Sequence, residues 1–222
     1  MRLRRSVQEH DVAVFGLGRF GSALALELVY AGYSVLGIDK SPAVVQSLAS
    51  RLPHVVAADP TNEETLRELG IQDFSRVVVA IGNDLASSIL ATSALLKMNG
   101  PDVWAKASTP QQGQILEQMG VKHIFYPETD MGRRAAHIVA QSFNDYVELG
   151  YGYALVSTTV NDAMTGKQLA DLGLRRAKGI SVIAVKGSND QWVNAYAETI
   201  LKPGDEILAV GPAKTIGSIV AE

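Results

Sequence analysis

Residues 12–21 read Val12-Ala13-Val14-Phe15-Gly16-Leu17-Gly18-Arg19-Phe20-Gly21. An apolar run leads into the pattern Gly-x-Gly-x-x-Gly, and a helical pattern follows it. In such motifs the first glycine permits a tight turn, the second lets the backbone approach a pyrophosphate, and the third lets the helix pack closely on the strand. Free amides and the helix dipole then favour an anion at the turn. The stretch therefore predicts a nucleotide-binding strand–turn–helix of the Rossmann type.

A carboxylate follows at the position where a Rossmann fold binds ribose. Asp39 ends the second predicted strand, close to the spacing of about 20 residues from the motif that is typical of ribose-binding acids. A carboxylate there favours unphosphorylated ribose over the 2′-phosphate of NADP, because like charges repel each other. The competing interpretation is that the glycines only form a turn and that Asp39 caps the next helix. The combined pattern favours the ligand site.

Short β-branched runs alternate with longer helical patterns from Asp11 to Tyr126, as in successive βαβ units around a parallel sheet. The predicted strands are residues 12–15, 34–38, 54–57, 76–81, 103–106 and 123–126. The predicted helices are residues 21–30, 42–51, 63–69, 84–97 and 111–119. We expect an α/β fold, a doubly wound parallel sheet of the Rossmann type, with a second, smaller α+β domain.

A longer helical pattern covers about residues 131–146, and the glycine-rich stretch Gly150-Tyr151-Gly152 follows it. We expect the second domain to begin there. We divide the chain into a flexible tail (1–10), a Rossmann nucleotide-binding domain (11–130), a crossover helix and linker (131–150) and a small α+β domain (151–222). In the last of these we expect strands near 154–160, 181–185 and 206–210 and a short helix after Gly166. A domain of roughly 70 residues is marginally stable alone, so we expect it to pack on a neighbour or to dimerise.

Composition excludes several classes of protein. The 222 residues carry 20 basic and 23 acidic side chains, so no general field favours nucleic acid or an anionic bilayer. Cysteine is absent, which excludes disulfides and thiolate sites and fits a reducing cytoplasm. Every apolar run is interrupted well before the ~20 residues of a membrane-spanning helix. We therefore expect neither a nucleic-acid partner nor a membrane-embedded chain.

Further charged residues follow the predicted strands, at the edge where α/β proteins bind ligands. Arg19 could extend over bound phosphates or lie in solvent at the helix start. Asp59, after the third strand, could flank adenine or ribose, or cap a helix, whereas for Asn83 and Asp84 capping is the better interpretation. Lys106 ends the fifth strand, where a phosphate contact is expected.

Glu128 follows the sixth predicted strand in Tyr126-Pro127-Glu128-Thr129-Asp130. A carboxylate there could meet a phosphate-bound cation or cap the next helix. Position alone favours capping.

The histidines do not form a catalytic site. His10, His54, His123 and His137 are scattered over the tail, two strand edges and a helix, without an HExxH pair or a nearby nucleophile. We therefore expect a protein that is not an enzyme. The runner-up is an NAD-dependent oxidoreductase, because the glycine motif and Asp39 suit NAD equally well. A nucleotide-sensing adaptor for another partner is the third interpretation.

Several motifs together are more specific than any one alone. They are Val14-Phe15-Gly16-Leu17-Gly18-Arg19-Phe20-Gly21, Val79-Ala80-Ile81-Gly82, Val103-Trp104-Ala105-Lys106-Ala107, Tyr126-Pro127-Glu128-Thr129-Asp130-Met131-Gly132 and Leu201-Lys202-Pro203-Gly204-Asp205-Glu206-Ile207-Leu208-Ala209-Val210-Gly211. With these motifs the chain resembles the RCK (regulator of conductance of potassium) proteins of bacterial Ktr and Trk potassium-uptake systems, especially the KtrA type. The resemblance extends over nearly the whole chain.

The resemblance implies a non-enzymatic regulator that forms a ring, commonly an octamer built from dimers, beneath a membrane-embedded potassium channel or transporter. Such a protein is cytoplasmic and peripheral at the inner face of the membrane. In the family ATP and ADP compete for the Rossmann site, and some members bind NAD or NADH. The helix after Met131 would link the lobes and pair subunits. Some C-terminal lobes bind cyclic di-AMP, and Arg175 lies in the corresponding region, although Gly173 and Leu174 do not reproduce a polar pocket of that kind.

The family's site residues carry over by motif position. Asp39 would contact the ribose, and Arg19 and Lys106 the terminal phosphates. Glu128 would help hold a divalent cation, Mg²⁺ or Ca²⁺, that accompanies ATP. The candidate nucleotide-binding residues are Gly16, Gly18, Arg19, Phe20, Gly21, Asp39, Lys40, Asp59, Ile81, Gly82 and Lys106.

Overall fold

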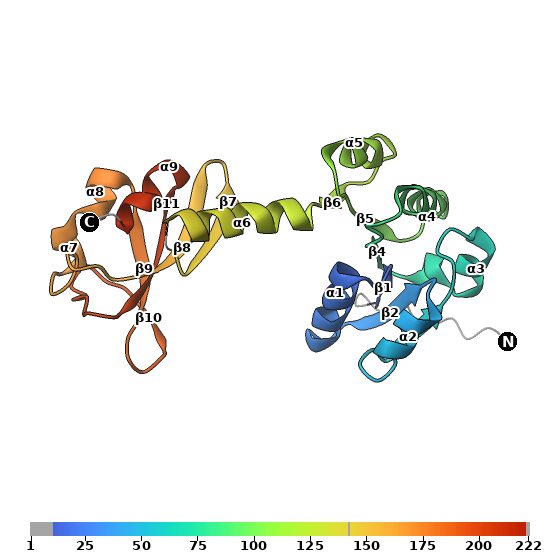
Figure 1. The fold of residues 1–222 in the computed structure, drawn as a ribbon, viewed down its shortest axis with the longest axis horizontal. Coiled ribbons are helices and arrows are strands. Elements are labelled where there is room, and N and C mark those ends of the chain that lie inside the picture. The colour runs from blue at the N-terminus through green and yellow to red at the C-terminus, as the bar shows by residue number, and fades with distance from the viewer. Residues whose placement is uncertain (1–10, 142, 221–222) are drawn as a thin grey trace. The chain divides into compact units, whose positions relative to one another are not determined.

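The computed structural model describes residues 11–141 and 143–220. The predicted tail at residues 1–10, which contains His10, lies outside the described residues. The chain forms two compact units that divide between Thr129 and Asp130, and Figure 1 follows it through both from blue to red.

The first unit is built on a sheet of six parallel strands. Their order is β3-β2-β1-β4-β5-β6, the doubly wound order with its switch point between β1 and β4. The predicted Rossmann-type sheet is therefore confirmed, and each strand begins and ends within two residues of its predicted position. The strands are β1 (Asp11–Phe15), β2 (Ser34–Asp39), β3 (His54–Ala57), β4 (Arg76–Val79), β5 (Asp102–Lys106) and β6 (His123–Phe125).

Neighbouring strands of this sheet end at the same level. Phe15 of β1 pairs with Ile38 of β2 and with Val79 of β4. Just beyond, the amide of Gly16 donates to the carbonyl of Ile38 (2.8 Å) and the amide of Ala80 donates to that of Phe15 (2.7 Å). The loops after β1, β2 and β4 therefore begin side by side at the carboxyl edge of the sheet.

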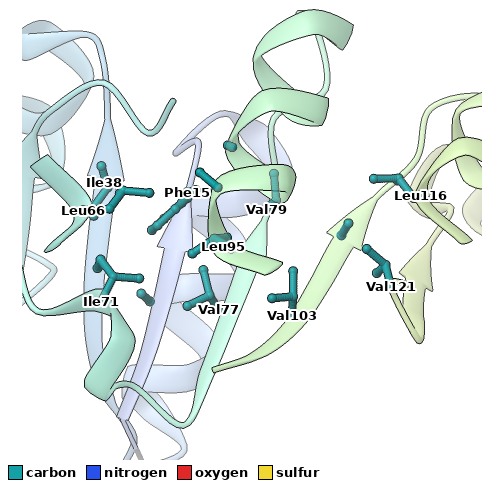
Figure 2. Packing of buried hydrophobic residues seen from close by; sticks show 14 of the residues in the cluster. Phe15, Ile38, Leu66, Ile71, Val77, Val79, Leu95, Val103, Leu116 and Val121 are labelled. Carbon is teal, nitrogen blue, oxygen red and sulfur yellow. The ribbon is translucent and has the colours of Figure 1, made fainter. Parts of the chain in front are cut away.

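Two hydrophobic clusters enclose the sheet. Successive residues of β1 alternate between them, because side chains of a strand point to opposite faces: Val12 and Val14 belong to one cluster, Ala13 and Phe15 to the other. Figure 2 shows the second cluster, where Phe15 packs among aliphatic residues from the strands and helices. The helices of this unit are α1 (Arg19–Tyr30), α2 (Pro42–Leu48), α3 (Glu63–Glu68), α4 (Leu85–Lys97) and α5 (Pro110–Gln118), with the 3-10 turn η1 (Ile71–Asp73).

Polar side chains fix where four of these helices begin. The side chains of Ser41, Asn62, Asp84 and Thr109 accept backbone amides at the starts of α2, α3, α4 and α5. The predicted start at Ser41-Pro42 and the predicted cap at Asp84 are confirmed.

The second unit contains an antiparallel sheet of five strands in the order β10-β9-β11-β8-β7. Its core includes Val156, Ile180, Ile207 and Ile216. The predicted smaller α+β domain is confirmed. Its strands are β7 (Asp145–Gly150), β8 (Tyr153–Thr159), β9 (Ser181–Lys186), β10 (Trp192–Asn194) and β11 (Glu206–Pro212), and its helices are α7 (Leu169–Leu172), α8 (Leu174–Lys178), α9 (Ala213–Ile216) and the 3-10 turn η2 (Gly217–Ile219).

The segment before β8 differs from the prediction. Helix α6 covers Pro127–Gln141, whereas the sequence pattern placed a helix over 131–146. Tyr146 lies in β7, and Gly150-Tyr151-Gly152 is the turn between β7 and β8, with φ values of +84°, +50° and +77°. Tyr146 is the one buried residue of β7. The strand therefore lacks the alternation of apolar and polar residues that would identify it in the sequence.

Within the second unit α6 is tied to β7. The Nε and Nη2 atoms of Arg134 donate to the two carboxylate oxygens of Asp145 (2.8 and 2.6 Å), and His137 stacks on Tyr146. No helix among residues 11–141 and 143–220 is both long and apolar enough to cross a membrane.

Candidate functional site

Two adjoining cavities open at the carboxyl edge of the parallel sheet, and together we call them the cleft. Their volumes are about 250 and 70 Å³. Every predicted nucleotide-binding residue except Gly21 lines one of them. The larger is lined by Gly16, Gly18, Arg19, Phe20, Asp39, Lys40, Ala80, Ile81, Gly82, Asn83, Asp84, Lys106 and Glu128, and the smaller by Gly16, Asp39, Lys40, Asp59, Pro60, Ile81 and Ser87.

Larger cavities lie elsewhere, but their chemistry differs. One of about 360 Å³ lies at the amino ends of β1 to β3, between Asp11, Ser34 and His54, and its wall is mainly apolar. Another of about 600 Å³ lies in the second unit, beside Arg175 and Arg176. Neither includes the glycine turn. We therefore place the candidate site by its convergent amides and charges and not by volume.

The three motif glycines have different structural roles. Gly16 has φ +86°, and a Cβ atom there would lie 2.9 Å from Cγ1 of Ile81, so the turn requires glycine. A Cβ atom on Gly21 would lie 1.9 Å from the carbonyl oxygen of Gly16, so Gly21 lets α1 pack against the turn. Gly18 has φ −66° and open space where a Cβ atom would lie. The fold does not require glycine at position 18, the residue expected to face a pyrophosphate.

Asp39 supports the glycine turn directly. Its Oδ2 atom accepts the amide of Leu17 (2.7 Å), and its Oδ1 atom accepts the amide of Ser41 (2.8 Å). The cap of α2 is Ser41 itself and not Asp39. Each carboxylate oxygen can accept a second hydrogen bond, so Asp39 can hold the turn and also bind a hydroxyl group in the cleft.

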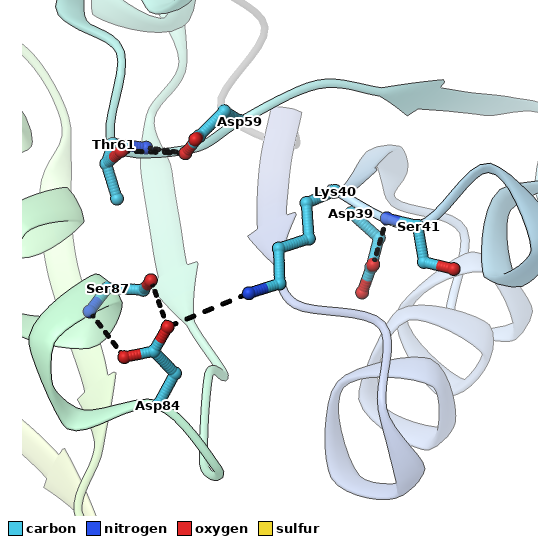
Figure 3. A network of polar contacts seen from close by, with 7 residues as sticks. All are labelled: Asp39, Lys40, Ser41, Asp59, Thr61, Asp84 and Ser87. Carbon is cyan, nitrogen blue, oxygen red and sulfur yellow. Dashed lines mark hydrogen bonds and ion pairs between the residues drawn. The ribbon is translucent and has the colours of Figure 1, made fainter.

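Lys40 bridges two sides of the cleft, as Figure 3 shows. Its Nζ atom lies 3.7 Å from Oδ2 of Asp84, whose carboxylate also accepts the amide (3.0 Å) and hydroxyl (2.5 Å) of Ser87 at the start of α4. The hydrogen bonds from Ser87, and then the positive charge of Lys40, hold the pKa of Asp84 below its ordinary value. The sequence indicated the cap at Asp84, but it gave no sign of the contact with Lys40.

Asp59 has a structural role at the wall of the smaller cavity. Its Oδ1 atom accepts both the amide (2.9 Å) and the hydroxyl (2.7 Å) of Thr61. These bonds are the main cause of a lowered pKa for Asp59, so the residue is anionic at neutral pH. Its Oδ2 atom has no hydrogen-bond partner within the described part of the chain, so Asp59 can also accept a donor from a ligand.

Lys106 is the most deeply buried cation of the cleft. Its side chain is 8% exposed, and its Nζ atom lies 2.5 Å from Oε1 of Glu128, which is 60% exposed. A Cβ atom on Gly82 would lie 2.8 Å from that ammonium group, so Gly82 leaves the space that Lys106 fills. The hydrogen bond from Lys106 is the main cause of a lowered pKa for Glu128.

Arg19 contributes a cation without a fixed partner. It opens α1 and is exposed, and no carboxylate in the described ranges lies within ion-pair distance of its guanidinium group. Its positive charge nevertheless contributes to the lowered pKa of Glu128. Arg19 is therefore available to an anion in the cleft.

Of the histidines in the described residues, two stack on aromatic rings. His123 stacks on Trp104 with its Nε2 atom 3.7 Å from Asp102, and His137 stacks on Tyr146. None of them lines the cleft.

Comparison with known sequences finds two family models that cover most of the chain. The TrkA-N domain matches residues 12–127 and the TrkA-C domain matches residues 153–222. Ktr system potassium uptake protein A of Vibrio alginolyticus is 36% identical over 205 residues, which are 92% of this chain and 93% of the relative. Ktr system potassium uptake protein C of Bacillus subtilis (strain 168) is 33% identical over 207 residues, which are 93% and 94% of the two chains.

Solved structures share the fold. The GsuK RCK domain matches with a TM-score of 0.52 and 25% identity, over 96% of this chain and 47% of that one. The GsuK channel bound to NAD matches with a TM-score of 0.51 and 24% identity, over 96% and 38%. This chain thus spans less than half of either structure, whereas it spans nearly all of both Ktr proteins. The chain therefore belongs to the RCK family of TrkA-N and TrkA-C domain proteins, together with the Ktr system potassium uptake proteins.

Proposed function

We propose that this chain is a nucleotide-sensing regulatory subunit of a potassium uptake system. The observation that carries the proposal is the cleft, where the glycine turn, Asp39 and the cations Arg19, Lys40 and Lys106 converge. Amides and cations match a diphosphate, and the carboxylate matches ribose hydroxyls. Its membership of a family with Ktr potassium uptake proteins supports potassium transport as the process.

ATP and ADP are the proposed ligands, with NAD or NADH as the alternative. The amide of Gly18 would contact the diphosphate beside the turn that Gly16 permits, Asp39 would contact the ribose, and Arg19 and Lys106 the terminal phosphates. Asp59 would lie beside the base or ribose. A channel of the same fold, GsuK, has been solved with NAD bound.

A divalent cation, Mg²⁺ or Ca²⁺, would accompany ATP beside Glu128. Within the described residues no group of three His, Cys, Asp or Glu side chains could hold a metal ion. The exposed Glu128 carboxylate would therefore supply one oxygen ligand, and the phosphates of the nucleotide would supply others. The cation would neutralise phosphate charge that Lys106 alone leaves unbalanced.

The proposed assembly is a homo-oligomeric ring, an octamer built from dimers, beneath a membrane-embedded potassium channel or transporter at the cytoplasmic face. Helix α4 supports self-association, because Lys97 is its one charged residue and Leu85 and Leu90 are 53% and 57% exposed. A helix with so little charge and with leucines on its outer side is usually covered on that side too. The sheet covers one side of α4, and a second copy would cover the other.

Regulation would follow from a population shift. A nucleotide changes the shape of a ring only if it binds one shape more tightly than another. We assign that difference to Arg19, which a γ-phosphate would reach and which ADP would leave unpaired. No nucleic acid and no chemical turnover enter this mechanism.

Calorimetry of the nucleotide-free protein with ATP, ADP, NAD and NADH tests the proposal. We expect ATP and ADP to bind, and we expect Arg19→Ala to narrow the ratio of their affinities, while Arg51→Ala, an exposed arginine outside the cleft, does not. If the ratio of ATP to ADP affinity is unchanged in Arg19→Ala, Arg19 does not have this role. If the protein binds none of the four nucleotides, the proposal is overturned. Copurification with a potassium-translocating subunit tests the partner.

Two further assays separate the alternatives. Steady turnover of NADH with carbonyl substrates would favour an oxidoreductase. Titration with cyclic di-AMP tests the cavity beside Arg175 and Arg176 in the second unit.

A further inference from the structure

A buried glutamine lies behind the cation that ends β5. The side-chain Nε2 atom of Gln112, on α5, donates to the backbone carbonyl of Lys106 (3.3 Å) and to the hydroxyl of Ser88 (3.2 Å). Its Oε1 atom accepts the amide of Ser108 (2.8 Å). One side chain therefore joins both ends of the short segment from Lys106 to Ser108 and connects that segment to α4.

The burial of these groups restricts how they can be arranged. Gln112 is 5% exposed and Ser88 is fully buried. A buried amide group is stable only when its donors and acceptor are satisfied, and here the three contacts satisfy them. The side chain of Gln112 therefore has one favourable orientation, and that orientation fixes the backbone of Lys106.

The position of this backbone matters because the lysine side chain is long and flexible. The ammonium group of Lys106 lies in the space beside Gly82 and reaches Glu128 in the cleft. A shift of the backbone would move the ammonium group out of that space, and a phosphate contact depends on its position.

We infer that Gln112 is a positioning residue for nucleotide binding, which acts by holding Lys106 where a terminal phosphate of ATP or ADP can meet it. This inference rests on the proposed function, because it takes a phosphate as the partner of Lys106. Gln112 itself does not line the cleft.

The test is calorimetry of Gln112→Met with ADP and with adenosine. Methionine has a similar length but makes none of the three contacts. We expect the affinity for ADP to fall about fivefold, which corresponds to the loss of one hydrogen bond, here the one between Lys106 and the phosphate. We expect the affinity for adenosine to stay the same. In a Lys106→Met background, Gln112→Met should cause no further loss of ADP affinity. Gln114→Met, an exposed glutamine on the same helix, is the matched control.

The outcomes are distinct. Equal losses for ADP and adenosine, or the same loss with and without Lys106, would mean that Gln112 only stabilises the fold, and either overturns the inference. If Gln112→Met does not fold, Ser88→Ala replaces it, because this variant removes one of the three contacts. We then expect the affinity for ADP, but not that for adenosine, to fall about twofold. If the affinity for ADP does not fall, the inference is overturned. Failure of the unaltered protein to bind ADP would overturn both this inference and the proposed function.

Discussion

The Nζ atom of Lys106 lies 2.5 Å from the Oε1 atom of Glu128, so the most buried cation of the cleft is paired with a carboxylate of the protein. The hydrogen bond from Lys106 lowers the pKa of Glu128, and the carboxylate is therefore charged at neutral pH. A phosphate that approaches this ammonium group must compete with Glu128. A divalent cation between the phosphate and Glu128 would turn that repulsion into attraction.

Glu128→Gln separates these two effects. In EDTA we expect the variant to bind ADP about two- to fivefold more tightly, because a competing charge is removed from an ion pair whose carboxylate is exposed. We expect Mg²⁺ or Ca²⁺ to raise the ATP affinity of the unaltered protein but not that of the variant. Calorimetry with and without the metal measures both, and Glu117→Gln, an exposed carboxylate on α5, is the control. Weaker binding of ADP in EDTA would contradict the competition.

The motif glycines allow a matched pair of substitutions. Gly21→Ala would place a methyl group 1.9 Å from the carbonyl oxygen of Gly16, so we expect the free energy of unfolding to fall by about 3 kcal/mol. Gly18→Ala meets open space at an ordinary φ of −66°, so the fold should be stable to within about 0.5 kcal/mol. Its methyl group would nevertheless face the diphosphate, and we expect at least about a tenfold loss of ADP affinity. Urea unfolding and calorimetry check the pair, and normal ADP binding by Gly18→Ala would place the diphosphate elsewhere.

Local patterns were sufficient to predict the parallel sheet, whereas contacts between distant residues were not predictable. The six strands alternate with helices that begin at recognisable caps, such as Ser41 and Asp84. The contacts of Lys40 with Asp84 and of Lys106 with Glu128 join residues that are distant in sequence. These contacts depend on which strand ends lie side by side, and no spacing rule along the chain expresses that.

The second unit was predicted less well because its edge strands bury little. β10 has three exposed residues, and β7 buries Tyr146 alone. Strands with so few buried side chains have no apolar period, so the helical pattern of α6 appeared to continue through the start of β7. The contact of Gln112 with Lys106 was also missed, because a glutamine has no motif that would signal it.

Asp39→Asn tests the link between the glycine turn and the ribose site. An asparagine side chain has one acceptor oxygen, so either the amide of Leu17 or that of Ser41 loses its partner. We expect the free energy of unfolding to fall by about 1–2 kcal/mol. We also expect the affinity for NADP relative to NAD to rise, because the negative charge beside the ribose is gone. Urea unfolding and competitive binding measure the two effects, with Asp162→Asn as an exposed control. An unchanged NADP-to-NAD ratio would argue against ribose at Asp39.

Glu206 should make the stability of the second unit depend on pH. Its Oε2 atom lies 2.6 Å from Nζ of Lys186, and its Oε1 atom accepts the hydroxyl of Ser157. These two hydrogen bonds lower the pKa of Glu206 from its ordinary 4.5, and the bond from Lys186 has the larger effect. A lowered pKa means that the stabilisation is complete above about pH 4.5 and is lost as the pH falls through the pKa of the folded state.

We expect Glu206→Gln to lower the free energy of unfolding by about 1–2 kcal/mol at pH 7 and by less below pH 4.5. Urea unfolding followed by the fluorescence of Trp192, which lies beside Lys186 in the same unit, provides the measurement in a Trp104→Phe background. Glu198→Gln, at an exposed carboxylate, is the control, and its free energy of unfolding should not differ from that of the unaltered protein in a pH-dependent way. A difference that stays constant with pH would mean that the ionised carboxylate is not what stabilises the unit.

Leu90→Glu tests whether α4 is a contact between subunits. Leu90 is 57% exposed, while Ala91 and Leu95 of the same helix are buried in the core, so the substitution changes the outer surface and leaves the packing intact. A charge at the centre of an apolar contact must be desolvated without a partner, and we expect the assembly to dissociate. The melting temperature of the separated subunit should stay within a few degrees of normal, because exposed substitutions have small effects on stability.

Light scattering coupled to gel filtration measures the mass of the assembly. Tyr30→Glu, at a side chain on α1 that is 90% exposed, is the control that should leave the assembly intact. If Leu90→Glu and the unaltered protein have the same mass above that of one chain, α4 is not the contact, and the outer surface of this helix needs another explanation.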